Sequence, residues 1–183
     1  MVVFMASFFF ESEPVHLGDI YFRTPKSDRS HPGDIRQWWT YAYMPAARYL
    51  DKELYILTSK STFSAAEGLP KRLQALKRAV VVGERTRGGN NPGLLVAVQP
   101  NFAVFVPTGK PIKKGDEQSN PDGGIQPDIE VPADQALARA QIEALRHKLE
   151  KTPNEREKLQ PLIDHLETEL AKSTTRTLES NSP

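Results

Sequence analysis

The chain has 183 residues, enough to bury a core in one medium domain with an appendage. Its 24 basic and 23 acidic residues leave a net charge of +1, which excludes the strongly basic surface of a nucleic-acid-binding protein. The absence of cysteine excludes a thiol nucleophile, disulfides and thiolate metal sites. No grouping of His, Asp and Glu has the spacing of metal ligands, so no metal or cofactor is expected.

The N-terminal part of the sequence predicts one apolar segment followed by short strands. Met1–Phe10 is expected to form a core helix or strand, because it is too short to span a bilayer and lacks the basic start of a signal peptide. Strands are predicted at 19–23, 35–43 and 54–57, with loops at 24–33 and 44–52. Trp38 and Trp39 are adjacent in the second strand, so one side chain is expected to point inward and the other outward. They are interpreted as packing residues, although the outward ring is a candidate for lining a substrate groove.

The polar stretch after residue 57 indicates a strand that turns directly into a helix running towards Arg78. Ser64 occupies the corner, where unpaired N–H groups and the helix dipole favour developing negative charge. Two interpretations stay open: a nucleophile with the Ala65 N–H as oxyanion donor, or the N-cap of an ordinary capping box closed by Glu67. Pro70 adds a second alternative, in which the helix either bends there or begins there.

The C-terminal part of the sequence predicts a strand, a hairpin, a long loop and two helices. The expected segments are a strand at 79–82, a loop at 85–93, hairpin strands at 94–99 and 102–107, and a loop at 110–127. Apolar stripes from Ala138 to Leu149 and from Leu159 to Leu170 predict a helical hairpin, joined by a capping box at 152–155. Residues 173–183 are rich in Ser and Thr and are expected to be disordered.

Three sequence blocks follow one another along the chain: Thr58–Glu67 (Thr-Ser-Lys-Ser-Thr-Phe-Ser-Ala-Ala-Glu), Val80–Gly89 (Val-Val-Val-Gly-Glu-Arg-Thr-Arg-Gly-Gly) and Gly124–Val131 (Gly-Ile-Gln-Pro-Asp-Ile-Glu-Val). In this order, they resemble the tail-specific (carboxy-terminal processing) serine peptidases. This is family forty-one of the serine type, and the chain is similar to the branch with interphotoreceptor retinoid-binding protein and the tricorn core. The resemblance implies an α/β fold of the crotonase/Clp-protease-like β-β-α spiral, in partial form, with a C-terminal helical hairpin. The implied division is a peptidase core at 1–132, the hairpin at 133–172 and the tail at 173–183.

The resemblance also implies the roles of individual residues. Ser64 takes the place of the nucleophile, the Ala65 N–H that of an oxyanion donor, and Asp122 that of the acid that orients a histidine. The family's histidine and its second oxyanion donor come from a segment upstream of Met1, so the chain resembles a C-terminal half. Gly89 stands where the Ser–Lys branch has its lysine, which excludes that dyad at the matching position.

Other candidates for these roles are weaker. His16, His31, His147 and His165 are the histidines of the chain, and each is expected to be a solvated or packing residue. Glu84 and Glu117 are alternatives to Asp122, whose Pro-Asp-Gly-Gly context is also an ordinary turn signature, and Asp128 is expected to be structural. Gly88 and Gly93 have Walker-like spacing without the Lys and Ser/Thr that a phosphate site needs, so Gly88 and Gly89 are expected to let backbone pass close to Ser64.

The leading hypothesis is a serine endopeptidase that cleaves polypeptides and is inactive as the isolated chain. The alternatives are a ligand- or peptide-binding module with an apolar cavity near Trp38 and Trp39, and an assembly piece whose surface is the helical hairpin. A second copy or the upstream half of the same peptidase is the expected protein partner. A periplasmic or extracytoplasmic location is implied by the resemblance alone.

Overall fold

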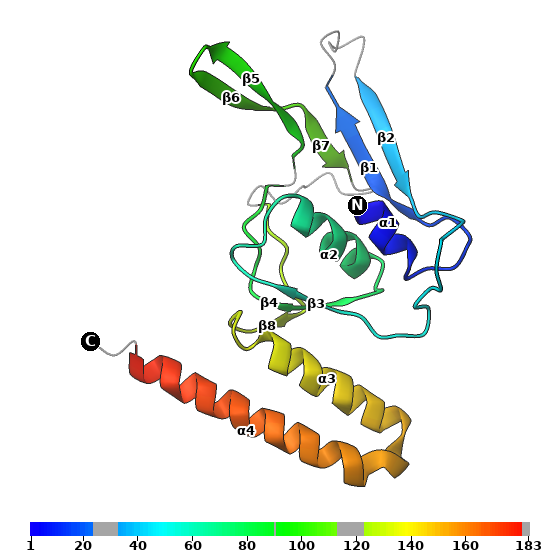
Figure 1. The fold of residues 1–183 in the computed structure, drawn as a ribbon, viewed down its shortest axis with the longest axis vertical. Coiled ribbons are helices and arrows are strands. Elements are labelled where there is room, and N and C mark those ends of the chain that lie inside the picture. Colours follow the sequence, from blue (N-terminus) through cyan, green and yellow to red (C-terminus); the bar gives the residue numbers. More distant parts are fainter. Residues whose placement is uncertain (24–32, 90, 113–122, 181–183) are drawn as a thin grey trace. The chain divides into compact units, whose positions relative to one another are not determined.

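The computed structural model describes residues 1–23, 33–89, 91–112 and 123–180. In chain order the elements are α1 (Val2–Ser7), β1 (His16–Phe22), β2 (Asp34–Trp39), β3 (Tyr55–Thr58), α2 (Ala65–Ala75), β4 (Val80–Gly83), β5 (Gly93–Gln99), β6 (Phe102–Pro107), β7 (Gly109–Ile112), β8 (Ile129–Glu130), α3 (Ala136–Lys151), a 3₁₀ turn (Pro153–Glu155) and α4 (Arg156–Ser180). The expected mixed α/β fold with a C-terminal helical hairpin is confirmed (Figure 1).

Segments from different parts of the sequence interleave to form two compact units. The first contains Met1–Lys52, Thr62–Arg78 and Arg87–Ile125, and the second contains Glu53–Ser61, Ala79–Thr86 and Gln126–Pro183. This differs from a division at residue 132, because β3, β4 and β8 belong to the same unit as the helical hairpin.

An antiparallel sheet in the order β2-β1-β7 organises the first unit (Figure 1). In the central strand, Tyr21 pairs with Ile35 of β2 on one side and with Lys110 of β7 on the other. The prediction of loop from residue 110 was therefore wrong for the residues that form β7. A four-residue strand containing Pro111 carries no pattern of its own, and it forms because β1 supplies its hydrogen-bond partners at the sheet edge.

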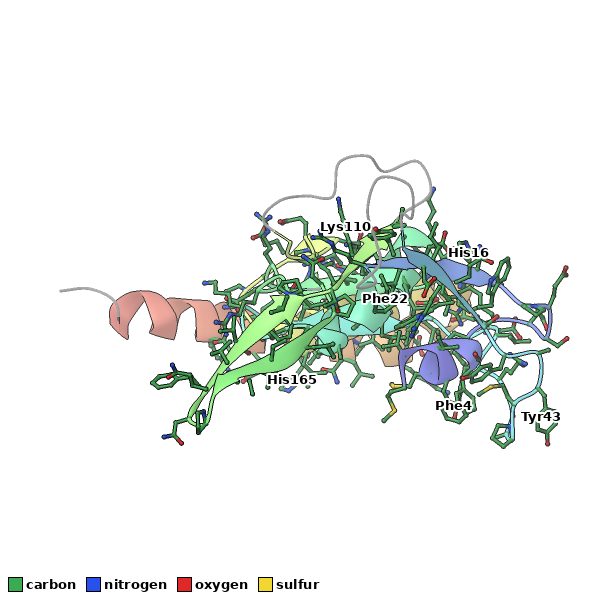
Figure 2. All side chains as sticks on the ribbon, turned by 90° about the horizontal axis from the view of Figure 1, so that it is seen from above. Phe4, His16, Phe22, Tyr43, Lys110 and His165 are labelled. Atoms are coloured by element: carbon green, nitrogen blue, oxygen red, sulfur yellow. The ribbon has the colours of Figure 1, made fainter. Side chains whose placement is uncertain are left out.

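Helices α1 and α2 pack together in the first unit. Val2–Ser7 of the predicted segment Met1–Phe10 forms a helix, as one of the two alternatives predicted, and Ala6 and Ser7 are its buried residues. Its opposite side is exposed: Phe4 projects outward, as does Tyr43 in the loop after β2, with exposed fractions of 40% and 83% (Figure 2). Gly68 brings α2 close to α1, since a Cβ atom there would lie 3.4 Å from a methyl group of Val2.

The tryptophan pair alternates as predicted. Trp38 is partly buried beneath the guanidinium of Arg72 on α2, 4.5 Å from the ring centre, and Trp39 is 44% exposed and packs against His16. Burial lowers the pKa of the Arg72 guanidinium. Because each indole contacts a polar neighbour, this region gives no support to an apolar ligand site.

The hairpin of β5 and β6 extends from the base of β7 (Figure 1). Both strands match the predicted ranges to within one residue. The Pro92 carbonyl accepts hydrogen bonds from the N–H groups of Thr108 and Gly109, each at 2.9 Å, which holds the two ends of the hairpin together. Beyond this base, every residue from 94 to 107 is exposed.

A parallel sheet in the order β3-β4-β8 organises the second unit. Val82 of β4 packs against Ala136 and Ala140 of α3, and these three residues are the centre of the core. Asp128 is structural, as predicted: its N–H donates to the Val81 carbonyl at 2.8 Å, and its carboxyl oxygen accepts from the Val81 N–H at 2.7 Å. Because α3 of the helical hairpin packs on the sheet of its own unit, the structure argues against the helical hairpin as a free interaction surface.

The helical hairpin joins α3 to α4 through buried Ile142, Leu159 and Ile163. The capping box predicted at 152–155 was wrong. The Thr152 hydroxyl donates back to the Lys148 carbonyl at 2.8 Å, and the Glu155 carboxyl pairs with the Lys148 ammonium at 2.9 Å. Helix α4 continues to Ser180, so most of the segment expected to be disordered is helical.

Tyr55 at the start of β3 makes the stability of the second unit sensitive to alkali. Burial, together with the neighbouring carboxyl of Glu53, raises the pKa of Tyr55 from 10.0 to about 12. The folded state thus keeps the phenol proton more tightly than the unfolded state. The stabilisation is complete below pH 10 and is lost as pH rises towards 12.

We therefore expect the free energy of unfolding of the unmodified chain to fall as pH rises above 9, and to fall less in Tyr55→Phe. Urea denaturation at each pH, monitored by circular dichroism, measures both. The hydroxyl of Tyr55 donates to Glu53 at 3.2 Å, so the variant starts from a slightly lower stability below pH 10. Identical pH profiles for the two proteins would contradict the assignment to Tyr55.

Candidate active site around Ser64

Ser64 has a backbone conformation that serine rarely adopts. Its φ is 56° and its ψ is −120°, and α2 begins at the next residue. Among the described residues, Lys77 is the only other non-glycine residue with positive φ, and it ends α2 in an ordinary Schellman motif, with the Arg78 N–H bonded to the Leu73 carbonyl at 2.8 Å. Residues in such conformations cost about 1–3 kcal/mol and concentrate at functional sites. The strain at Ser64 has no helix-ending role to account for it.

Glu67 holds the backbone of Ser64 in this conformation. The Glu67 side chain is fully buried, and its Oε2 atom accepts from the Ser64 N–H at 2.8 Å. Its Oε1 atom accepts from the Gly88 N–H at 2.9 Å. The predicted reach of Glu67 back to Ser64 is confirmed. The bond to Gly88 was not predicted, because nothing in the local sequence indicates a contact across 21 residues.

The start of α2 resolves the alternatives raised by Pro70. The helix runs from Ala65 to Ala75 with Pro70 inside it, so the alternative in which the helix begins at Pro70 was wrong. Ser64, Ala65 and Ala66 are all exposed. Within the described part of the chain, the Ala65 N–H makes no hydrogen bond, so it is free to bind an oxygen at the positive end of the helix.

The loop at 87–89 lies against the segment that carries Ser64. The Arg87 N–H donates to the Thr62 carbonyl at 3.0 Å, and the Arg87 guanidinium lies 5.2 Å from the centre of the Phe63 ring. Gly89 has a φ of 142°, and a Cβ atom there would be 2.1 Å from the Phe63 ring. Gly123 also approaches this loop, with its Cβ position 3.3 Å from the Cα atom of Gly88. The predicted site glycines are therefore close to Ser64, while Asp122 and Glu117 lie outside the described residues.

This close approach gives a prediction for Gly89→Ala. The new methyl group would displace the Phe63 ring, whereas Gly18→Ala places a methyl group at a similar φ of 129° with nothing within 4 Å. Both variants carry the backbone strain of positive φ, so their difference isolates the contact with the ring. We expect Gly89→Ala to lower the free energy of unfolding by about 1–2 kcal/mol more than Gly18→Ala does.

The measurement is urea denaturation of both variants, with Phe63→Ala added to each. Removing the ring should abolish the difference, since the methyl group then has space. A difference that persists without the ring would show that the loop does not contact Phe63 in solution.

The described histidines have other partners or are exposed. In the first unit, the Nε2 atom of His16 bonds the Asp19 carboxyl, and no hydrogen bond connects it to Ser64. In the second unit, the Nδ1 atom of His147 lies 2.6 Å from the Glu53 carboxyl, and His165 is exposed on α4. His31 lies outside the described residues. The structure therefore identifies no general base for Ser64 within the described part of the chain.

The remaining candidates are Glu84 and the two lysines near Ser64 in the sequence, Lys60 and Lys71, and each is paired elsewhere or exposed. Glu84 accepts from the Lys60 N–H at 3.1 Å and pairs with the Lys60 ammonium at 3.4 Å, which accounts for both residues within the second unit. Lys71 is exposed on α2. Residues 1–23, 33–89, 91–112 and 123–180 contain no cluster of three metal-ligating side chains. Over the same residues, no helix has the length and apolar character to cross a membrane.

Several solved structures, one of them of a peptidase, share this fold. Mature CPAF has a TM-score of 0.59 and 12% identity over 81% of this chain and 41% of its own. A peptidase from Parabacteroides merdae ATCC 43184 has a TM-score of 0.53 and 21% identity over 72% of this chain and 40% of its own. A lipoprotein from Streptococcus agalactiae has a TM-score of 0.52 and 16% identity over 77% of this chain and 47% of its own. The chain thus spans less than half the length of these structures.

The family to which the chain belongs is shown by a second comparison, with models of protein families. The model of Peptidase family S41 matches residues 5–131, which include Ser64, the glycine loop and all three sequence blocks. The match agrees with the resemblance found in the sequence and with the fold of the solved structures. The chain therefore belongs to Peptidase family S41.

Proposed function

We propose that this chain carries the nucleophile side of a serine-peptidase active site, with Ser64 as the nucleophile. The observation that carries the proposal is the strained, exposed Ser64 at the start of α2, held by buried Glu67. A strained turn into a helix presents a hydroxyl to a cleft and aims the following N–H groups at the same point. Membership of a serine-peptidase family supports the same role.

In the proposed reaction the Ser64 hydroxyl attacks a peptide carbonyl carbon while a base takes the hydroxyl proton. The carbonyl oxygen becomes an oxyanion, which the free Ala65 N–H and the positive end of α2 stabilise. Collapse of this intermediate breaks the C–N bond, and the base returns the proton to the leaving amine. Water then hydrolyses the acyl ester on Ser64. The site proposed here contributes two of the groups this chemistry needs, the nucleophile and one oxyanion donor.

The remaining groups are assigned to other parts of a complete site. We infer that Asp122 orients a histidine supplied by another segment, and that the same segment supplies the second oxyanion donor. The chain spans 41% of mature CPAF and 40% of the Parabacteroides peptidase, which is consistent with a partial site. The isolated chain should therefore be inactive towards peptides, because a serine without a base is a weak nucleophile. The inferred substrate is a polypeptide bound in extended form.

The test is labelling with a fluorophosphonate probe, which reacts only with an activated serine. The chain alone should not be labelled, and the chain joined to the upstream sequence of its reading frame should be labelled at Ser64. Ser64→Ala should abolish the signal, whereas Ser61→Ala, which removes an exposed hydroxyl three residues earlier, should keep it.

Each possible result decides one part of the proposal. An extended chain that folds but is not labelled would refute Ser64 as a nucleophile. Cleavage of peptides by the chain alone, lost in Ser64→Ala, would refute the partial site while supporting the nucleophile. Labelling that survives Ser64→Ala and maps to another residue would refute the assignment of the nucleophile.

A further inference from the structure

The hairpin of β5 and β6 exposes an apolar surface with no partner in the described structure. Residues 93–107 contain no charged side chain. Eight of their large apolar side chains are 40–74% exposed: Leu94, Leu95, Val96, Val98, Phe102, Val104, Phe105 and Val106. Isolated exposed apolar residues are normal, but a contiguous patch of this kind marks an interaction site.

The pairing of the strands separates this surface into two unequal faces. Leu94 pairs with Val106 and Val96 pairs with Val104, so these residues share one face, because side chains alternate along a strand. Together with Val98 and Phe102 near the turn they form the surface that we call the valine face. On the other face, Leu95 pairs with Phe105, Ala97 pairs with Ala103, and the Phe105 ring covers Gly93. Leu95 and Phe105 are the only large apolar side chains of the hairpin strands on this face, against six on the valine face. The valine face is therefore the broader apolar surface.

The hairpin is held in place from its base. The paired hydrogen bonds to the Pro92 carbonyl close its two ends, and the Thr108 carbonyl accepts from the Arg23 N–H of the neighbouring sheet at 2.7 Å. A hairpin with only two strands cannot cover either of its own faces, and both its edges offer unpaired backbone groups. Its position is thus set by the first unit, while its apolar faces have no partner among the described residues.

We propose that the valine face packs against the valine face of a second copy of this chain to form a two-fold symmetric dimer. At roughly 100 Å² for each of six side chains, one face offers on the order of 600 Å², and two faces bury about 1,200 Å², the lower limit of a specific interface. A surface without charged side chains brings no like charges together when it meets a second copy of itself, and sheets pack face to face in this way. This inference does not depend on the catalytic role of Ser64.

Two matched pairs of substitutions test the proposal in the chain as it exists. Val104→Glu and Val96→Glu place a carboxylate at the centre of the valine face. Ala103→Glu and Ala97→Glu place it on the opposite face, one residue away on the same strands. All four positions are exposed, so each variant can fold, and circular dichroism verifies that it does. In a two-fold dimer each valine-face substitution brings two like charges together.

Sedimentation velocity over a range of concentrations gives the oligomeric state. We expect the unmodified chain to form dimers, and each valine-face variant to weaken the dimer at least about a hundredfold. The two opposite-face variants should retain dimerisation within about tenfold of the unmodified chain. A chain that is monomeric at every concentration would overturn the proposal. So would equal effects of the two faces, or open-ended assemblies larger than a dimer, which indicate pairing through the strand edges.

Discussion

Replacing Glu67 by alanine lowers the free energy of unfolding by about 3 kcal/mol, because the backbone N–H groups of Ser64 and Gly88 lose the buried carboxylate that accepts from them. An unsatisfied buried donor costs about 1–3 kcal/mol, and the truncated side chain also leaves a cavity where Glu67 was fully buried. The effect combines the loss at Ser64 with the loss at Gly88. Urea denaturation, compared with the unmodified chain, measures it.

Glu67→Gln separates the two contributions. Glutamine fills the same volume but has one carboxamide oxygen, so its NH₂ group must face one of the two backbone donors. We expect it to cost less than alanine and still at least about 1 kcal/mol. A glutamine variant as stable as the unmodified chain would show that the second acceptor is not needed, and would contradict the bridging role of Glu67.

The same variants connect the fold to the site. If Glu67 fixes the backbone of Ser64 and the glycine loop together, losing it should slow fluorophosphonate labelling of the extended chain under conditions where the variant is still folded. Gly123→Ala is a useful comparison, because it crowds the same loop at Gly88 while keeping the Glu67 carboxylate. A Glu67→Ala variant that is folded and labelled at the normal rate would leave Glu67 a purely stabilising residue.

The parts of the fold that the sequence predicts are those governed by local pattern. The alternating and apolar runs of β3, β4, β5 and β6 and the stripes of α3 and α4 identify these elements without reference to their neighbours. The same is true of the corner at Ser64, where a short polar stretch separates a strand from a helix. Local interactions decide these elements, so the sequence around each of them is sufficient.

The parts that the sequence does not predict depend on distant partners. Strand β7 forms because β1 offers an edge, and Thr152 binds the end of α3 in place of capping the next helix. The bond from Gly88 to Glu67 and the contact of Gly89 with Phe63 likewise join residues more than twenty positions apart. The sequence therefore predicts the Ser64 corner of the site, whereas the support beneath it appears only in the structure.

Ser64→Gly and Ser64→Ala should both abolish labelling of the extended chain while affecting stability differently. Neither variant has a hydroxyl to react, so the loss of signal is complete in each case. Glycine adopts a φ of 56° without steric cost, but alanine keeps the clash of its Cβ atom. We expect Ser64→Gly to be more stable than Ser64→Ala by about 1–2 kcal/mol in urea denaturation.

Lys77 provides the calibration, because its φ of 54° lies on the same helix and serves only to end it. Lys77→Gly should exceed Lys77→Ala in stability by about 1 kcal/mol, the usual preference for glycine at a left-handed helix end. If the glycine advantage at Ser64 equals or exceeds that at Lys77, the chain keeps a serine where glycine would be more stable, and the hydroxyl is retained for chemistry. If Ser64→Gly has no advantage while Lys77→Gly does, the strain at Ser64 is absent in solution and the capping interpretation is favoured instead.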